Sequence, residues 1–273
     1  MADIDIAGTR GKIVVRRWLP APVGEEATAP RYVVLLAHGY GEHSGRYEHV
    51  AAALTADGAA VYAPDHYGHG RSAGDRAVVD NIDGMASDLG RVADVAEREH
   101  GEIPLILVGH SLGGMIATRA LQNHNVRPAA VVLSGPLVGG NPDLLALATK
   151  DPIPEIPLDT EALSRDPAVG AAYIADPLVF HGPWHKKTLM EIGATVERIA
   201  AGGDFGDLPT LWLHGAADTL VPYDVTKKAM KRLKGAVFAE KKYAGAKHEI
   251  LNETNKDEVI ADLLAFISAI VPA

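Results

Sequence analysis

The sequence predicts an α/β fold with a mostly parallel central sheet, an N-terminal antiparallel hairpin, helices on both faces of the sheet and an inserted helical cap. Short apolar runs alternate with longer amphipathic stretches, the order expected of parallel strands joined by crossover helices. The runs are continuous rather than alternating in polarity, as expected of strands buried on both faces. Residues 136–203 interrupt this order with prolines and scattered apolar residues, and a segment of that length is expected to carry helices of its own.

The hairpin is expected first along the chain, from two short strands joined around Gly8 and Gly11. A Pro/Glu-rich loop, Pro20–Pro30, separates it from the first parallel strand. Strands are predicted at Asp3–Ala7, Lys12–Trp18, Tyr32–Ala37, Ala59–Ala63, Leu105–Val108, Ala129–Leu133, Thr210–Leu213 and Val237–Tyr243. Helices are predicted at Tyr47–Ala56, Met85–His100, Met115–His124, Val225–Leu233 and Val259–Ile270. The expected core therefore comprises residues 1–135 and 204–273, and the cap, residues 136–203, is inserted between two strands.

The composition limits the classes of partner and of chemistry. The chain has 273 residues, of which 47% are hydrophobic and 22% charged, values ordinary for a globular enzyme. Its formal net charge of −9, from 35 acidic and 26 basic residues, argues against nucleic acid as a partner and against electrostatic attraction to anionic membranes. Any lipid contact would therefore be apolar. The absence of cysteine from the sequence excludes disulfides, thiol nucleophiles and Cys-ligated zinc.

The N-terminal residues and the apolar runs bear on location. The first six residues, MADIDI, have neither the basic region nor the apolar region of a signal peptide. No apolar run approaches the length of about 18 residues that a membrane span requires. We therefore expect a cytoplasmic protein, with at most peripheral contact with a membrane.

The strongest motif is Gly109-His110-Ser111-Leu112-Gly113-Gly114, which matches the pattern G-x-S-x-G. A predicted strand enters this turn and a predicted helix leaves it, which is the context of the nucleophile elbow in the α/β-hydrolase fold. The flanking glycines let the strand and the helix approach closely, so that a serine hydroxyl stands at the carboxyl edge of the sheet. A chance match is the alternative in a chain with 28 glycines, but the strand–turn–helix context favours Ser111 as a nucleophile.

A serine hydroxyl becomes a nucleophile only when a nearby base accepts its proton, and in this fold the chain order is Ser, Asp or Glu, then His. His248 lies on the loop between the last strand and the last helix, which can bring an imidazole above Ser111. His214 ends a strand directly before Gly215 and is interpreted as shaping that turn. Other histidines lie at a helix end or in the cap, at His124, His181 and His185. We therefore predict His248 as the base.

The base needs an acid that fixes its tautomer and stabilises its protonated form. Asp218 lies on the loop that follows the strand ending near Gly215, at the carboxyl edge of the sheet. Asp224 is the alternative, but it lies near the start of the next helix, where a carboxylate has a structural use. We predict Asp218 as the acid.

Two backbone N–H groups are expected to stabilise the negative charge that develops on the substrate oxygen. One belongs to Leu112, the residue after the nucleophile, at the N-terminus of a helix. The other is assigned to Tyr40, because the loop His38-Gly39-Tyr40-Gly41 follows the first parallel strand and its glycines let the backbone turn an N–H inward. The simpler interpretation, a tight turn alone, is compatible with this role.

Several blocks of the sequence together resemble the monoacylglycerol lipases, in their bacterial form, and the lysophospholipase-like hydrolases beside them. The blocks are His38–Tyr47, Asp65–Ser72, Gly109–Gly114, Asp218–Pro222 and His248–Glu253, with Ser164–Pro167 and Asp176–Val179 in the cap. The resemblance implies cleavage of single-chain acylglycerol esters through an acyl-enzyme on Ser111, beneath a cap with an apolar lining. It implies no cofactor and no metal, with Asp65, His66 and His69 belonging to a loop scaffold rather than to a metal site.

The resemblance also bears on the polar end of the substrate. It implies that Glu42 and Arg46 help to bind the glycerol group, and the alternative is an ion pair that stabilises the turn. Some animal members carry a histidine near the glycerol, three positions after the catalytic one, where this chain has Leu251. The expected partner is a small lipid ester, with transient contact between the cap and a membrane or a lipid aggregate.

Three alternative functions stay open on the sequence alone. A general carboxylesterase or lysophospholipase would share every catalytic feature. A cofactor-free perhydrolase or carbon–carbon hydrolase would use the same three residues. A non-catalytic binding protein on this fold would usually lack one of the three, and Ser111, Asp218 and His248 are all present.

Overall fold

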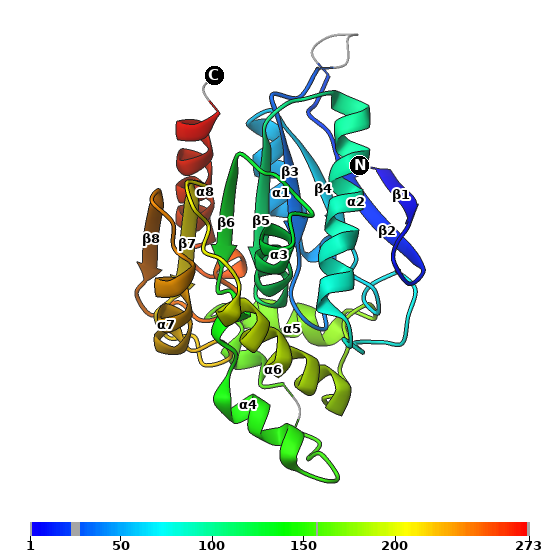
Figure 1. Ribbon diagram of the computed structural model, residues 1–273, viewed down its shortest axis with the longest axis vertical. Helices are drawn as coiled ribbons and strands as arrows, with labels where there is room; N and C mark the ends of the chain where they lie inside the picture. Colours follow the sequence, from blue (N-terminus) through cyan, green and yellow to red (C-terminus); the bar gives the residue numbers. More distant parts are fainter. Residues whose placement is uncertain (1, 23–27, 157, 272–273) are drawn as a thin grey trace.

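The described chain forms one eight-stranded sheet with helices on both faces (Figure 1). The computed structural model describes residues 2–22, 28–156 and 158–271, so part of the predicted loop Pro20–Pro30 and one residue of the predicted cap lie outside the described residues. The strands are β1 Ala2–Ala7, β2 Lys12–Trp18, β3 Tyr32–Ala37, β4 Ala59–Pro64, β5 Leu105–His110, β6 Ala130–Ser134, β7 Thr210–Gly215 and β8 Phe238–Tyr243. The predicted α/β fold is confirmed, and each strand lies within two residues of its predicted bounds.

The strand order brings four loops to one edge of the sheet. The order is β1-β2-β4-β3-β5-β6-β7-β8. β1 and β2 form the predicted antiparallel hairpin, β2 pairs antiparallel with β4, and the remaining pairs are parallel. Parallel strands end at the same edge, so the loops that follow β3, β5, β7 and β8 meet there. This edge is where the predicted site residues are expected.

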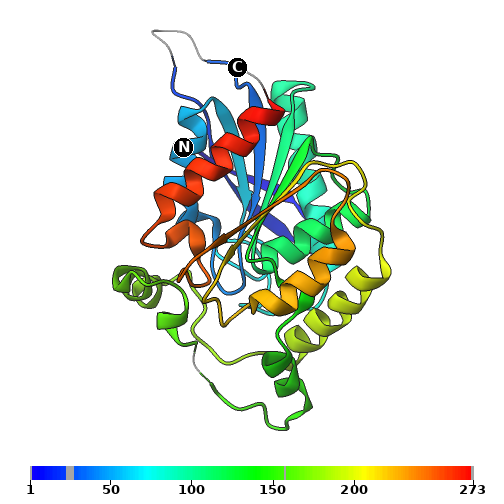
Figure 2. The same ribbon diagram turned by 90° about the vertical axis from the view of Figure 1, so that its left-hand side faces the viewer.

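Helices cover both faces of the sheet (Figure 2). Their apolar side chains complete two buried clusters, one on each face. On one face lie α1 Glu48–Ala56 and α8 Lys256–Ile270, and on the other lie α2 Ile82–His100, α3 Leu112–Gln122 and α7 Tyr223–Leu233. Successive residues of a strand point to opposite faces. Leu35 of β3 accordingly packs with Leu89 of α2, whereas Leu36 packs in the layer that holds Leu54 of α1. The continuous apolar run of β3 therefore serves both layers.

The segment between β6 and β7 is helical, as predicted, and contains no strand among its described residues. Its α-helices are α4 Pro142–Ala146, α5 Pro167–Ala175 and α6 Lys186–Ala201. The prolines start helices rather than break them, because Asn141 and Asp166 cap α4 and α5 and a proline takes the first helical position of each. α4 and α5 lie beyond the carboxyl edge of the sheet (Figure 1), whereas Ile192 and Ile199 of α6 join the core layer. The division at residues 136 and 203 stays a prediction.

The helix ends differ from the prediction where polar groups set the boundary. α2 begins at Ile82 rather than Met85, because the Asn81 side chain accepts a hydrogen bond from the Gly84 N–H and caps the helix. α3 ends at Gln122 rather than His124, whose φ of 55° lies outside helical geometry. The helices that the structure describes all fall short of the combined length and apolarity needed to cross a bilayer.

Candidate active site

Ser111 stands on a sharp turn between the end of β5 and the first residue of α3. Its φ of 54° and ψ of −118° are rare for a residue with a side chain. The glycines on either side of Ser111 allow the backbone segments at this turn to pack closely. A Cβ on Gly113 would lie 2.1 Å from the carbonyl oxygen of Ala37, and a Cβ on Gly109 would lie 2.6 Å from the carbonyl oxygen of Gly113. The strand–turn–helix geometry expected of a nucleophile elbow is therefore present.

The three predicted catalytic side chains lie together at the carboxyl edge of the sheet. His248, on the loop after β8, has its Nε2 atom 2.9 Å from the Ser111 Oγ. Its Nδ1 atom lies 2.8 Å from Oδ2 of Asp218, on the loop after β7. All three residues are buried. Asp224, the alternative acid, lies in the first turn of α7 and is exposed. The geometry can pass a proton from the serine hydroxyl to the imidazole while the carboxylate holds the other ring nitrogen.

The electrostatics of the pair favour an ionised acid beside a basic imidazole. Burial raises the pKa of the Asp218 carboxyl, but the charge of His248 and the contacts with His214 and His248 outweigh burial, so its pKa lies below the usual value. Burial lowers the pKa of His248, and the neighbouring Asp218 more than offsets it, so the pKa of the imidazole lies above its usual value of 6.5. The carboxylate thus stabilises the imidazolium that forms when His248 takes a proton.

The two residues predicted to supply oxyanion donors lie on different segments beside Ser111. Leu112 is the first residue of α3, so its N–H has no partner within the helix. Tyr40 follows Gly39, and a Cβ on Gly39 would lie 3.3 Å from the Ser111 Cβ. Neither the Leu112 nor the Tyr40 N–H donates a hydrogen bond to another described residue. The assignment of these two N–H groups to an oxyanion hole stays a prediction.

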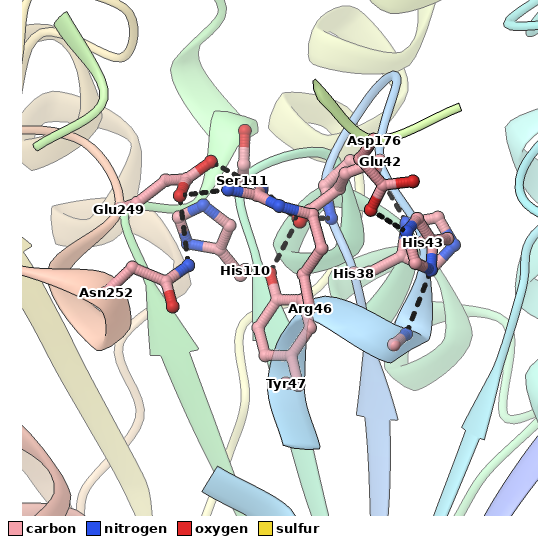
Figure 3. Close-up of polar contacts among 12 residues, drawn as sticks. His38, Glu42, His43, Arg46, Tyr47, His110, Ser111, Asp176, Glu249 and Asn252 are labelled. Atoms are coloured by element: carbon pink, nitrogen blue, oxygen red, sulfur yellow. Dashed lines mark hydrogen bonds and ion pairs between the residues drawn. The ribbon is translucent and has the colours of Figure 1, made fainter. Parts of the chain in front are cut away.

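Glu42 and Arg46 belong to a buried polar network beside Ser111 (Figure 3). The Arg46 guanidinium lies 2.7 Å from Glu42 and forms two bonds of 2.7 Å with Glu249, the residue after His248. Glu42 also accepts hydrogen bonds from the Gly39 N–H and the Tyr47 hydroxyl. Internal partners thus occupy both side chains, which favours the ion-pair interpretation. The network joins the Tyr40 loop to the His248 loop.

The segment 160–180 of the predicted cap contacts the same loops. The carbonyl oxygen of Leu163 accepts a hydrogen bond of 2.8 Å from the Glu249 N–H, and the Phe180 N–H donates one of 2.7 Å to the Gly41 carbonyl. A buried histidine, His43, contacts Asp176 at 2.8 Å (Figure 3). These contacts hold the segment over the carboxyl edge of the sheet, directly above the candidate site.

The sequence does not predict that two further buried histidines lie near Asp218 and His248. The ring of His110 stands 4.8 Å from that of His248, and burial together with the His248 charge lowers the pKa of His110 to about 3. His214 lies 3.3 Å from the Asp218 carboxylate, so it does more than shape the turn before Gly215. The position of His214 directly before that glycine was its only signal in the sequence.

The residues Asp65, His66 and His69 form internal loop contacts. Asp65 accepts hydrogen bonds from the N–H and hydroxyl of Ser44 and from the Arg71 N–H. The His66 N–H donates to the ring of His38. This arrangement agrees with the loop scaffold implied by the resemblance.

Sequence comparison assigns the chain to a family. Residues 28–255 match the family described as serine aminopeptidase, S33. The monoacylglycerol lipase of Mycolicibacterium smegmatis is 38% identical over 279 residues, covering 97% of this chain and 96% of the relative. The monoglyceride lipase of Homo sapiens is 31% identical over 234 residues, covering 82% of this chain and 77% of the relative.

Solved structures agree with the assignment. The monoacylglycerol lipase of Paleococcus ferrophilus is 28% identical, with a TM-score of 0.75 over 94% of this chain and 99% of its own. A monoglyceride lipase of Saccharomyces cerevisiae, 22% identical over 99% of this chain and 96% of its own, has a TM-score of 0.82 and supports the fold alone. The α/β-hydrolase fold and the predicted resemblance are both confirmed. The chain therefore belongs to the monoacylglycerol lipase family, within the serine aminopeptidase S33 group of α/β-hydrolases.

Proposed function

We propose that this chain is a carboxylic ester hydrolase that cleaves monoacylglycerol to fatty acid and glycerol through an acyl-enzyme on Ser111. The observation that carries the proposal is the continuous contact from Asp218 through His248 to the Ser111 hydroxyl, at 2.8 and 2.9 Å. The substrate is inferred from the relatives, because the monoacylglycerol lipase that is 38% identical aligns with nearly the whole chain.

The proposed reaction has two half-reactions, and in each of them His248 first accepts a proton and then returns it. The Ser111 oxygen attacks the ester carbonyl carbon while its proton passes to Nε2 of His248. The N–H groups of Tyr40 and Leu112 stabilise the oxyanion, and the C–O bond to glycerol breaks as His248 returns the proton to the leaving oxygen. Water then attacks the acyl carbon with His248 as base, and the fatty acid leaves as Ser111 regains its proton.

Glu42 and Arg46 are proposed to act through the network described above. Glu42 holds the Gly39 N–H, which precedes the proposed oxyanion donor Tyr40, and Arg46 ties Glu42 to the residue after His248. The network would therefore fix the spacing between the oxyanion donors and the base. Direct binding of the glycerol end by these two side chains stays a prediction, which the kinetics of Arg46 variants address.

The cap is proposed to make the contact with lipid aggregates. α5 contains no charged residue, and Ile174 on this helix is 63% exposed. Met190, on α6, is 61% exposed. Exposed apolar side chains of this kind mark surfaces that contact lipid or protein. The contact would be apolar and reversible, because the chain carries a net negative charge.

A kinetic panel tests the function. The substrates are 1- and 2-monoacylglycerols, diacylglycerols, lysophospholipids and short p-nitrophenyl esters, with Ser111→Ala as the control. We expect the highest kcat/KM on monoacylglycerols and no turnover by the variant. Preference for lysophospholipids or for short esters would replace the substrate assignment, and equal turnover by Ser111→Ala would remove the nucleophile.

A further inference from the structure

A second histidine contacts the proposed catalytic acid from inside the sheet. His214, on β7, has its Nε2 atom 3.3 Å from Oδ2 of Asp218, the same oxygen that contacts His248. The side chains of His214 and Asp218 are both fully buried. Two imidazoles therefore converge on one carboxylate oxygen, and only one of them reaches the nucleophile.

Trp212 fixes the tautomer of His214. The indole N–H of Trp212 donates a hydrogen bond of 3.1 Å to Nδ1 of His214. An indole nitrogen is only a donor, so Nδ1 of His214 must accept and the ring proton must lie on Nε2. The indole is itself held in place, because it stacks on the Tyr223 ring at 5.2 Å between centroids and 9° between planes. The N–H edge of His214 is therefore directed at the Asp218 loop.

The same ring closes the loop that holds Asp218. Nε2 of His214 lies 2.8 Å from the carbonyl oxygen of Val221. The N–H of Val221 in turn donates to Oδ1 of Asp218 at 2.8 Å, and the Leu220 N–H donates to the same oxygen at 3.0 Å. His214 thus holds the loop whose Leu220 and Val221 N–H groups donate to Oδ1 of Asp218. Its own Nε2 lies beside Oδ2 of the same carboxylate.

We propose that His214 is a positioning residue for Asp218, and that the Trp212 N–H, together with the Val221 carbonyl, holds the tautomer in which His214 does this. The proposal rests on the proposed function of the Ser111 site. His214 contacts neither the substrate nor the nucleophile in this scheme. It acts by holding the carboxylate in place and by drawing part of the negative charge of Oδ2 away from His248.

Removal of the His214 N–H should produce a change that loss of a purely structural contact would not produce. Without the His214 N–H, the Asp218 carboxylate loses a stabilising contact and interacts more strongly with the His248 imidazolium. The pKa of His248 should then rise. The acidic limb of kcat/KM, which reports the free enzyme, should move to higher pH. Loosening of the carboxylate should also lower kcat, by about 10-fold to 100-fold for a misplacement of about 1 Å, with KM little changed.

Two variants test the proposal from different sides. Trp212→Phe keeps an aromatic ring but removes the N–H that fixes the His214 tautomer. His214→Leu removes the ring N–H altogether, and His214→Gln returns an amide donor that should recover part of kcat. Trp18→Phe is the matched control, because the indole N–H of Trp18 is buried with no hydrogen-bond partner among the described residues. It should leave the pH profile unchanged.

The readouts are kcat/KM against pH per active site, thermal unfolding, and the rate at which a fluorophosphonate labels Ser111 at each pH. We expect the acidic limb of Trp212→Phe and His214→Leu to move upward in both activity and labelling. Profiles that superimpose on the wild type, with only a lower Tm or a lower active fraction, would overturn the proposal. If His214→Leu does not fold, His214→Phe, which keeps a ring but has no N–H, takes its place.

Labelling and hydrolysis together distinguish a failure of the proposed function from a failure of the proposed role of His214. A wild-type protein that is labelled but hydrolyses no ester contradicts the proposed function, and the pH dependence of labelling still tests His214. A wild-type protein that is not labelled at all contradicts both, because Ser111 is then not activated.

Discussion

Arg46→Met separates the two roles considered for Glu42 and Arg46. The Arg46 side chain is 10% exposed and neutralises Glu42 and Glu249, whose side chains are 4% and 5% exposed. Methionine keeps an unbranched side chain but leaves two buried carboxylates without a cation. Breaking a buried pair in this way costs about 3–5 kcal/mol of unfolding free energy. At about 2 °C per kcal/mol for a domain of this size, Tm should fall by about 6–10 °C.

The assay is thermal unfolding together with steady-state kinetics on a monoacylglycerol. Lys12→Met is the control, because Lys12 pairs with Asp5 at 3.2 Å with side chains that are 53% and 58% exposed, and exposed pairs contribute about 0–1 kcal/mol. The network also holds Gly39 beside the oxyanion donor Tyr40, so kcat should fall with little change in KM. A Tm equal to that of the control, with KM raised and kcat kept, would refute the network and favour direct binding of glycerol.

Four further predictions concern the nucleophile, the base, the elbow and the cap. Ser111→Ala should lower kcat by about 10⁴-fold or more. Ser111→Gly should be equally inactive but should unfold at a higher temperature than Ser111→Ala, because glycine adopts the φ of 54° without the strain of about 1 kcal/mol. The pKa of His248 is raised, and its imidazole must be neutral to act as a base, so kcat/KM should fall as the pH drops through a value above 6.5. A fall in kcat/KM only below pH 6.5 would contradict the Asp218–His248 pairing. Gly113→Ala should not yield folded protein by circular dichroism, since its Cβ would lie 2.1 Å from the carbonyl oxygen of Ala37. Ile174→Asp should weaken sedimentation with lipid vesicles while leaving turnover of a short, water-soluble ester unchanged.

Local sequence was sufficient for the central parallel strands, because each is a short apolar run, whereas β1 and β8 contain charged residues. Tyr32–Ala37 was predicted with the bounds that the structure has, since an arginine precedes it and the segment His38-Gly39 follows it. Helix starts were less predictable because capping decides them. The apolar pattern placed the start of α2 at Met85, whereas Asn81 begins it three residues earlier. The cap was located only as a region, because α4 has five residues and α5 is apolar on its exposed side as well as its buried side.

The three catalytic candidates were predictable for a different reason. Ser111, Asp218 and His248 each follow a strand of one parallel sheet, and the topology alone brings the ends of those strands together. Strand topology does not predict which residues hold these three side chains in place. Arg46 and Glu249 are 203 positions apart, and a glutamate after the catalytic histidine has no sequence pattern that names its partner.

The same distinction explains why His214 was interpreted only as a turn residue. A polar residue at the end of a buried strand can point into the core, toward the loop or toward the substrate, and the spacing His214-Gly215 is compatible with each. Two contacts select among them: the indole N–H of Trp212, two positions earlier on the same strand, takes Nδ1, and the Val221 carbonyl takes the Nε2–H beside Asp218. The arrangement therefore depends on a side chain that is buried in the core layer and does not contact the carboxylate. It follows that activity at this site is sensitive to a core residue whose apolar packing alone would suggest no more than a role in stability.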